Sequence, residues 1–101
     1  MENSSITAGA DICGVVRNSV LGPDVTVEKG AIVEDSVLMK GVTVKAGATV
    51  RYSILDDNVT IGQDATVGEY RMTASDVTVV GADVTVPDGK KIPAGSMISE
   101  M

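Results

Sequence analysis

The sequence predicts an all-β protein built as a single-stranded parallel β-helix, and three observations lead to this fold class. A block of about 17 residues repeats along the chain, aliphatic residues alternate with other residues inside each block, and large aromatic side chains are nearly absent. Repetition at a short fixed period is typical of solenoids, in which each copy packs only against its neighbours. The 101 residues are enough for one small domain.

The repeat is clearest in three segments that begin at Asn18, Asp35 and Tyr52 and continue as Ser-Val-Leu, Ser-Val-Leu and Ser-Ile-Leu. Each block holds three short units in which a small or β-branched residue stands two positions before an aliphatic residue. The aliphatic positions are 21, 27, 33, 38, 44, 50, 55, 61 and 67. Alternation with period two predicts strands whose i and i−2 side chains share one face, so each block forms three strands around a triangular core.

The residues between the strands favour tight corners. Two columns at the 17-residue spacing carry only Gly, Asp or Asn: Gly30, Gly47 and Asp64, and Asp24, Gly41 and Asn58. These residue types adopt positive φ at low cost. A prism this narrow leaves little room for rings, which agrees with the absence of Phe and Trp.

Residues 1–101 are expected to form a single β-helix domain of roughly five to six turns, with regular turns over about 4–68. The first turn is two residues shorter than the others, and the missing pair falls near Cys13-Gly14. Residues 69–76 break the pattern and are expected to form an irregular loop.

A capping turn is predicted over about 77–98. Val77-Thr78-Val79 is its first small-x-aliphatic unit, and Pro87 and Pro93 stand at its corners. Solenoids need an atypical terminal repeat to cover the last layer of the core.

The residue between the two inward positions of each unit faces solvent. Two outer faces then carry mostly Thr, whereas the third carries the apolar ladder Val20, Val37 and Ile54. Contiguous exposed apolar surface typically marks a docking site, so these three residues are the candidate interface. The alternative is that three aliphatic residues only raise the β-propensity of their strands.

Charges stack at the same spacing. Arg17, Glu34 and Arg51 alternate in sign, as do Glu28 and Lys45, and such cross-strand pairs are expected to stabilise the register. We interpret them as ion pairs of a solvated face and not as an active site.

The composition excludes several functions. The chain has no His, so neither a Ser-His-Asp nucleophile nor a His-ligated metal site can form within it. The net charge of −6 argues against nucleic acid and anionic membranes as partners. Cys13 is the single cysteine, which fits a reducing, cytoplasmic location. We therefore assign no catalytic, cofactor-binding or metal-binding residues, and no cofactor.

Three weaker patterns allow other interpretations. Asp56-Asp57-Asn58 could hold a cation but is interpreted as a solvated turn, because the ligand offsets of a calcium loop are absent. Cys13 has no His partner to activate it, so we expect a structural role. The exposed Thr column resembles that of ice-binding β-helices, but those present paired Thr columns and this chain has single ones.

The repeat resembles that of hexapeptide proteins, which fold as left-handed β-helices, and the handedness is implied by this resemblance alone. More specifically, the segments 16–22, 25–39 and 54–62 are similar to the C-terminal β-helix domain of ADP-glucose pyrophosphorylases (glucose-1-phosphate adenylyltransferases) of bacterial glycogen synthesis. The likeness covers residues 3–98. That family's catalytic residues lie in an N-terminal nucleotide-binding domain whose glycine-rich signature is missing here.

The resemblance implies that this chain is not itself an enzyme. It is expected to be a cut or stand-alone fragment of a longer nucleotidyltransferase. It implies a role in oligomerisation and in relaying allosteric effectors, with the missing catalytic domain and like subunits as partners. The alternative is a stand-alone scaffold or binding protein that self-assembles through its exposed apolar face. A divergent acyltransferase would need a general base from another chain.

Overall fold

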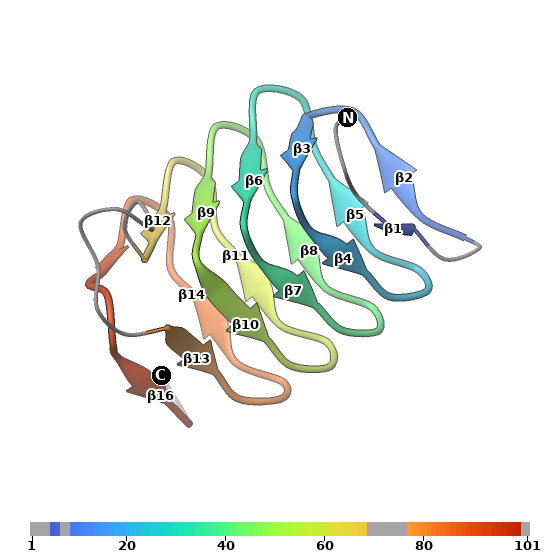
Figure 1. Ribbon diagram of the computed structural model, residues 1–101. Coiled ribbons are helices and arrows are strands. Elements are labelled where there is room, and N and C mark those ends of the chain that lie inside the picture. The colour runs from blue at the N-terminus through green and yellow to red at the C-terminus, as the bar shows by residue number, and fades with distance from the viewer. Residues whose placement is uncertain (1–4, 7–8, 69–76, 100–101) are drawn as a thin grey trace.

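The computed structural model describes residues 5–6, 9–68 and 77–99, and these consist of short strands joined by corners. Figure 1 shows successive coils stacked side by side, with each strand next to its counterpart in the neighbouring coil. All strand pairs are parallel, and the strands sort into one six-stranded and two five-stranded sheets. The predicted fold class, an all-β parallel β-helix, is confirmed.

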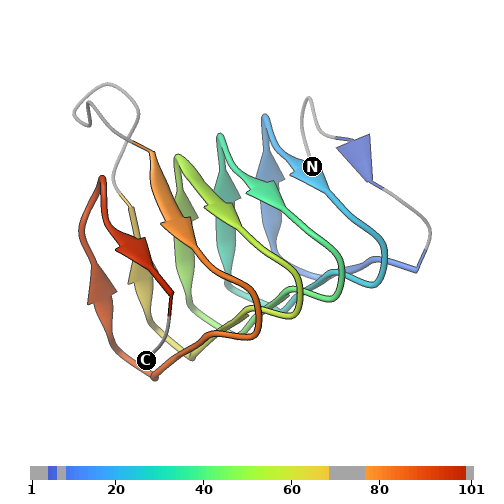
Figure 2. The ribbon, with the colours of Figure 1, turned by 90° about the horizontal axis from the view of Figure 1, so that it is seen from below.

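The three sheets form the three sides of the prism, and Figure 2 shows the coils from below. The six-stranded sheet contains β1 (Ser5–Ile6), β4 (Val20–Leu21), β7 (Val37–Leu38), β10 (Ser53–Leu55), β13 (Thr78–Val80) and β16 (Met97–Ile98). The β2 sheet contains β2 (Asp11–Ile12), β5 (Thr26–Val27), β8 (Thr43–Val44), β11 (Thr60–Ile61) and β14 (Thr85–Val86). The β3 sheet contains β3 (Val15–Arg17), β6 (Ile32–Glu34), β9 (Thr49–Arg51), β12 (Thr66–Val67) and β15 (Lys91–Ile92).

The core is a set of columns of small aliphatic side chains. Leu21, Leu38 and Leu55 pair in register along the six-stranded sheet and are almost fully buried, with Val80 and Ile98 next in the same column. Each of the other two sheets supplies a matching column of buried Val or Ile. Columns of Val and Ala stand two residues before these, as the alternation predicted.

Positive φ values mark the corners. Both predicted corner columns adopt them, from Asp64 at 57° to Gly30 at 83°. A third column, which the sequence analysis did not identify as a corner, contains Asn18, Asp35 and Tyr52 with φ near 50°. These residues turn the chain from the β3 sheet into the six-stranded sheet.

The register changes where the sequence departs from its period. Ser5 pairs with Val20 and Val15 pairs with Ile32, so the offset grows from 15 to 17 residues across the Cys13-Gly14 corner. Across the segment 69–76 the offset is 25, because Leu55 pairs with Val80, and between β13 and β16 it is 18. The loop predicted for 69–76 lies outside the described residues.

One predicted strand has the wrong phase. The unit Val77-Thr78-Val79 was expected to point Val77 and Val79 inward, but Thr78 and Val80 are buried and Val79 faces outward. The Thr78 hydroxyl is satisfied in the interior because it donates to Pro93 O and accepts from Gly95 N, both at 3.2 Å. This phase also continues the leucine column with Val80.

Candidate functional site

The outer face of the six-stranded sheet carries a continuous apolar ladder. Val20 pairs with Val37, Val37 with Ile54, Ile54 with Val79, and Val79 with Met97. Val20 is 51% exposed and Met97 81%, while the three middle side chains are partly exposed. We call these five residues the apolar ladder. The structure places the three predicted interface residues side by side on one surface, and their role as an interface stays a prediction.

Sequence reasoning missed the last two rungs of the ladder. The segment 69–76 interrupts the 17-residue period, so Val79 and Met97 could not be aligned with the earlier rungs by counting. The signal that could have found them is the pair Val79-Val80, in which either residue can face inward. Only pairing with β10 decides that Val80 does.

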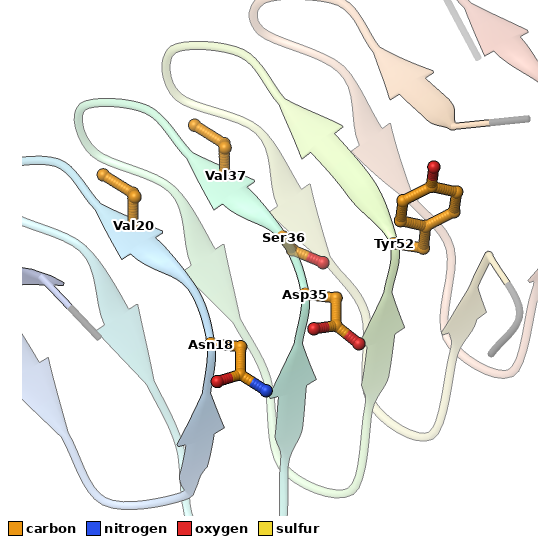
Figure 3. Close-up of a pocket in the computed structure, with 6 residues that line it drawn as sticks. All are labelled: Asn18, Val20, Asp35, Ser36, Val37 and Tyr52. Carbon is orange, nitrogen blue, oxygen red and sulfur yellow. The ribbon is translucent and has the colours of Figure 1, made fainter. Parts of the chain in front are cut away.

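A groove of about 440 Å³ lies between the ladder and the neighbouring corner. Figure 3 shows its lining: Val20 and Val37 from the strands, and the corner residues Asn18, Asp35 and Tyr52 beside them. Ser36 completes the lining. The groove therefore combines two apolar side chains with an amide, a carboxylate and a phenol, a mixture typical of protein-binding surfaces with a polar rim.

Tyr52 is the unusual member of this corner. Its φ of 48° lies in the left-handed region, which Asn and Asp tolerate but which is an outlier for a bulky side chain. Two coils earlier the same position is Asn18, and one coil earlier it is Asp35. Strained residues often occur at functional sites, so Tyr52 is a further candidate residue for the surface beside the ladder.

A buried serine ladder holds this corner in place. Ser36 Oγ donates to Glu34 O at 2.7 Å and accepts from Ser53 N at 3.2 Å. Ser19 Oγ makes the equivalent pair of bonds to Arg17 O and from Ser36 N, at 2.7 and 3.1 Å. Each hydroxyl thus links its own corner to the next coil, and the groove is built on a rigid support.

The charge column flanks the corner on the β3 sheet. Glu34 accepts from Arg51 Nε at 2.9 Å and from Arg17 Nη1 at 3.3 Å, as the sequence predicted. The hydrogen bond from Arg51 is the main reason that the pKa of Glu34 is lowered, and burial opposes it. The second predicted charge column behaves differently, since Glu28 Oε1 accepts from the backbone N–H of Ala46 at 3.0 Å.

The acidic pair Asp56-Asp57 has a structural role at its corner, whereas the expected structural role of Cys13 stays a prediction. Asp57 Oδ1 accepts from Lys40 N at 3.1 Å, and Asp56 Oδ1 accepts from Asp57 N at 2.7 Å, so both carboxylates bond corner N–H groups. Cys13 is exposed, with Sγ 3.7 Å from Asp11 Oδ1. Over the described residues, no three His, Cys, Asp or Glu side chains converge on a possible metal position. Nor does that part of the chain contain a helix long and apolar enough to cross a lipid bilayer.

Comparison with known proteins identifies the repeat. Residues 1–86 match the family model described as a GlmU-like C-terminal hexapeptide domain. No curated protein sequence matches the chain. The family match covers all coils up to β14 and so includes four of the five rungs of the apolar ladder.

Proposed function

Because the chain belongs to the family of GlmU-like C-terminal hexapeptide domains, we propose that it is a non-catalytic assembly and regulatory domain of a sugar nucleotidyltransferase. The observation that carries this proposal is the apolar ladder, five rungs in register on one face of the prism. Contiguous exposed apolar surface indicates docking. In the described part of the chain, the outward column of the β2 sheet consists of Asp11 and four Thr. That of the β3 sheet has two apolar residues, Val15 and Ile32, followed by two Thr and Lys91, so the ladder is the longest apolar row.

The finer identity that we propose is a glucose-1-phosphate adenylyltransferase of glycogen synthesis. Its support is the threefold recurrence of an Asn, Asp or Tyr followed by Ser, an aliphatic residue and Leu. The absence of His from the sequence argues against the acyltransferase chemistry that hexapeptide domains also carry, because those enzymes use a histidine base. The proposed partners are a catalytic domain and like subunits, in the cytoplasm.

The size of the ladder face favours docking on a larger partner over self-assembly. Six strands about 4.8 Å apart, each about four residues wide between corners, present roughly 350–400 Å². A stable complex normally buries about 800 Å² on each partner. A stand-alone scaffold that self-associates only through this face would therefore assemble weakly. A partner that is covalently linked to the chain, or that also contacts other surfaces of it, can dock stably on an area of this size.

Two experiments test the proposal. The purified chain is expected to make no ADP-glucose from ATP and glucose 1-phosphate, and the natural gene is expected to encode a nucleotidyltransferase domain upstream of this segment. Synthesis of ADP-glucose by this chain alone would contradict the assignment. A gene without such a domain would favour the scaffold alternative.

The docking face itself is tested with matched variants. Val37→Asp puts a charge in the middle of the ladder, and Thr43→Asp puts the same charge on the β2 sheet of the same coil, where Thr43 is also partly exposed. Binding to the nucleotidyltransferase domain, or self-association in sedimentation velocity, should fall at least tenfold for Val37→Asp only. Equal effects of the two variants would show that the ladder is not the docking face.

A further inference from the structure

The residue that follows each of the first four strands of the β2 sheet donates its N–H to the next coil. The four bonds are Cys13 N to Val27 O at 2.7 Å, and Glu28 N to Val44 O, Lys45 N to Ile61 O and Gly62 N to Val86 O at 2.9 Å. All of them run from an earlier coil to a later one. The corresponding groups of the last coil therefore face the C-terminal end of the prism, where a further coil would lie.

In two of the three sheets, the residue that follows the last strand is proline. Pro87 follows β14 in the column of Gly62, and Pro93 follows β15 in the column of Gly68, whose own N–H bonds to Ile92 O at 2.8 Å. Proline has no N–H and blocks the addition of a strand at a sheet edge. These two edges cannot continue the pattern of hydrogen bonds.

The six-stranded sheet has no such block. Its column consists of Gly22, Met39, Asp56 and Gly81, which donate to the next coil at 2.6–2.9 Å, and then Ser99 after β16. Ser99 retains its N–H. Ser96 also stands in the position of the serine ladder, and its Oγ donates to Pro93 O at 2.8 Å. In earlier coils this oxygen accepts the N–H of the next strand, so β16 offers both a donor and an acceptor.

A second groove lies across β13 and β16, the last two strands of this sheet. It has a volume of about 300 Å³ and is lined by Val79, Gly81, Met97, Ile98 and Ser99. Ile98 is only partly buried, although Leu55 and Val80 below it in the core column are fully buried. The last layer of this column is thus incomplete. Among the residues that the structure describes, β16 has a strand neighbour on one side only, as Figure 1 shows.

We propose that the free edge of β16 binds an extended segment of a partner protein, which adds to the six-stranded sheet as a further parallel strand. Strand addition of this kind takes its affinity from backbone hydrogen bonds and its selectivity from alternate side chains. The segment should contain Ser or Thr followed by two aliphatic residues, because the chain has this order at each strand of the sheet from β4 to β13.

A second copy of this chain does not fit the edge as well. Head-to-tail stacking of two prisms would bring all three edges of the last coil against another molecule. Pro87 and Pro93 remove a donor from two of those edges, whereas a single extended segment needs only β16. This proposal is independent of docking through the outer face of the ladder.

The probe is an acetylated, amidated peptide with the sequence of residues 17–22, Arg-Asn-Ser-Val-Leu-Gly. Titrated into the full isotope-labelled chain, it should shift the amide resonances of Met97, Ile98 and Ser99 in a saturable way. Ser99→Pro removes the donor and should weaken binding about tenfold, whereas Ser99→Ala keeps the N–H and should change affinity less than about twofold.

Modified peptides test the geometry without changing the protein. In a parallel pair the N–H of the peptide leucine faces β16 and that of the valine faces away. N-methylation at leucine should therefore abolish binding, and N-methylation at valine should leave it within about twofold.

Three outcomes would overturn the proposal: no saturable shifts at β16, equal affinity for the two methylated peptides, or unchanged affinity of a folded Ser99→Pro variant. Shifts confined to Val37 and Ile54 would assign the peptide to the outer face and reject the edge. Concentration-dependent stacking of the unmodified chain through β16 would identify a second copy as the occupant, which also contradicts the proposal.

Discussion

At the scale of single residues, the corners decide which substitutions the fold tolerates. Gly30 and Gly68 both adopt positive φ, at 83° and 77°. They differ in what surrounds them. A Cβ on Gly30 would have no neighbour closer than 3.6 Å, whereas a Cβ on Gly68 would overlap the backbone oxygen of Arg51 and approach Ser53 Oγ to 2.6 Å.

We expect Gly68→Ala to be far more destabilising than Gly30→Ala. The left-handed backbone alone should cost each variant about 1 kcal/mol. Overlap with a backbone atom in a packed interior should raise the loss for Gly68→Ala to about 3 kcal/mol. Urea unfolding measures both values, and an equal loss would show that the coil relaxes freely at Gly68.

Replacing Tyr52 is expected to increase the stability of the fold and to weaken the proposed docking. Tyr52→Asn replaces a strained residue by the type found at position 18, and should raise the free energy of unfolding by about 1 kcal/mol. The same variant removes the ring from the groove and should weaken docking at the ladder. Paired unfolding and binding measurements test this, and lower stability of the variant would mean that packing of the ring outweighs its backbone strain.

At the scale of elements, the coils are joined by side-chain ladders as well as by backbone pairing. The serine ladder links β4, β7 and β10 from inside, and the Arg17–Glu34–Arg51 column links β3, β6 and β9 from outside. Both repeat at 17 residues, so a shift in register would break every bond in them together. They therefore stabilise the register as well as the strands.

The pH dependence of stability should report the charge column. The pKa of Glu34 is lowered in the folded chain, chiefly by its bond with Arg51, from an ordinary value of 4.5. Its contribution to stability is therefore complete above pH 4.5 and is lost as the pH falls through the lowered folded value.

Glu34→Gln removes this contribution. The difference in unfolding free energy between the parent chain and the variant should be largest near pH 6 and should shrink below pH 4.5. Denaturant titrations at several pH values measure it. A difference that stays constant down to pH 2 would show that the ion pairs do not supply the stabilisation.

At the scale of the whole molecule, the proposed docking surface and the core occupy opposite faces of the same strands. Val37 and Leu38 are adjacent, yet Leu38 lies in the core and Val37 lies on the apolar ladder. The prism is thin, so each core column is only one side chain wide and has no second layer to absorb a defect.

This predicts opposite outcomes for adjacent substitutions. Leu38→Asp places an unpaired carboxylate in the core and should destabilise the chain by about 4 kcal/mol or more, which unfolds a small domain. Val37→Asp keeps its charge in water and should change stability by less than about 1 kcal/mol. Circular dichroism and thermal unfolding distinguish them, and comparable losses would mean that the inward and outward faces are exchanged.

The amino-acid sequence by itself determined the strands, their inward faces and the triangular coil from residue 18 to 68. It could do so because side-chain direction alternates with a period of two and the 17-residue repeat places like residues above one another. The same counting placed Val20, Val37 and Ile54 on one outer surface, and it paired Arg17 and Arg51 with Glu34.

Only the tertiary structure decided the strand phase and register where the 17-residue period is interrupted. Val77-Thr78-Val79-Val80 permits two phases, and pairing with β10 selects the one that buries Thr78 and extends the apolar ladder to Met97. The strained corner at Tyr52 and the edge of β16 that no described strand pairs likewise depend on backbone direction. That direction is set by hydrogen bonds between coils rather than by the order of residues along the chain.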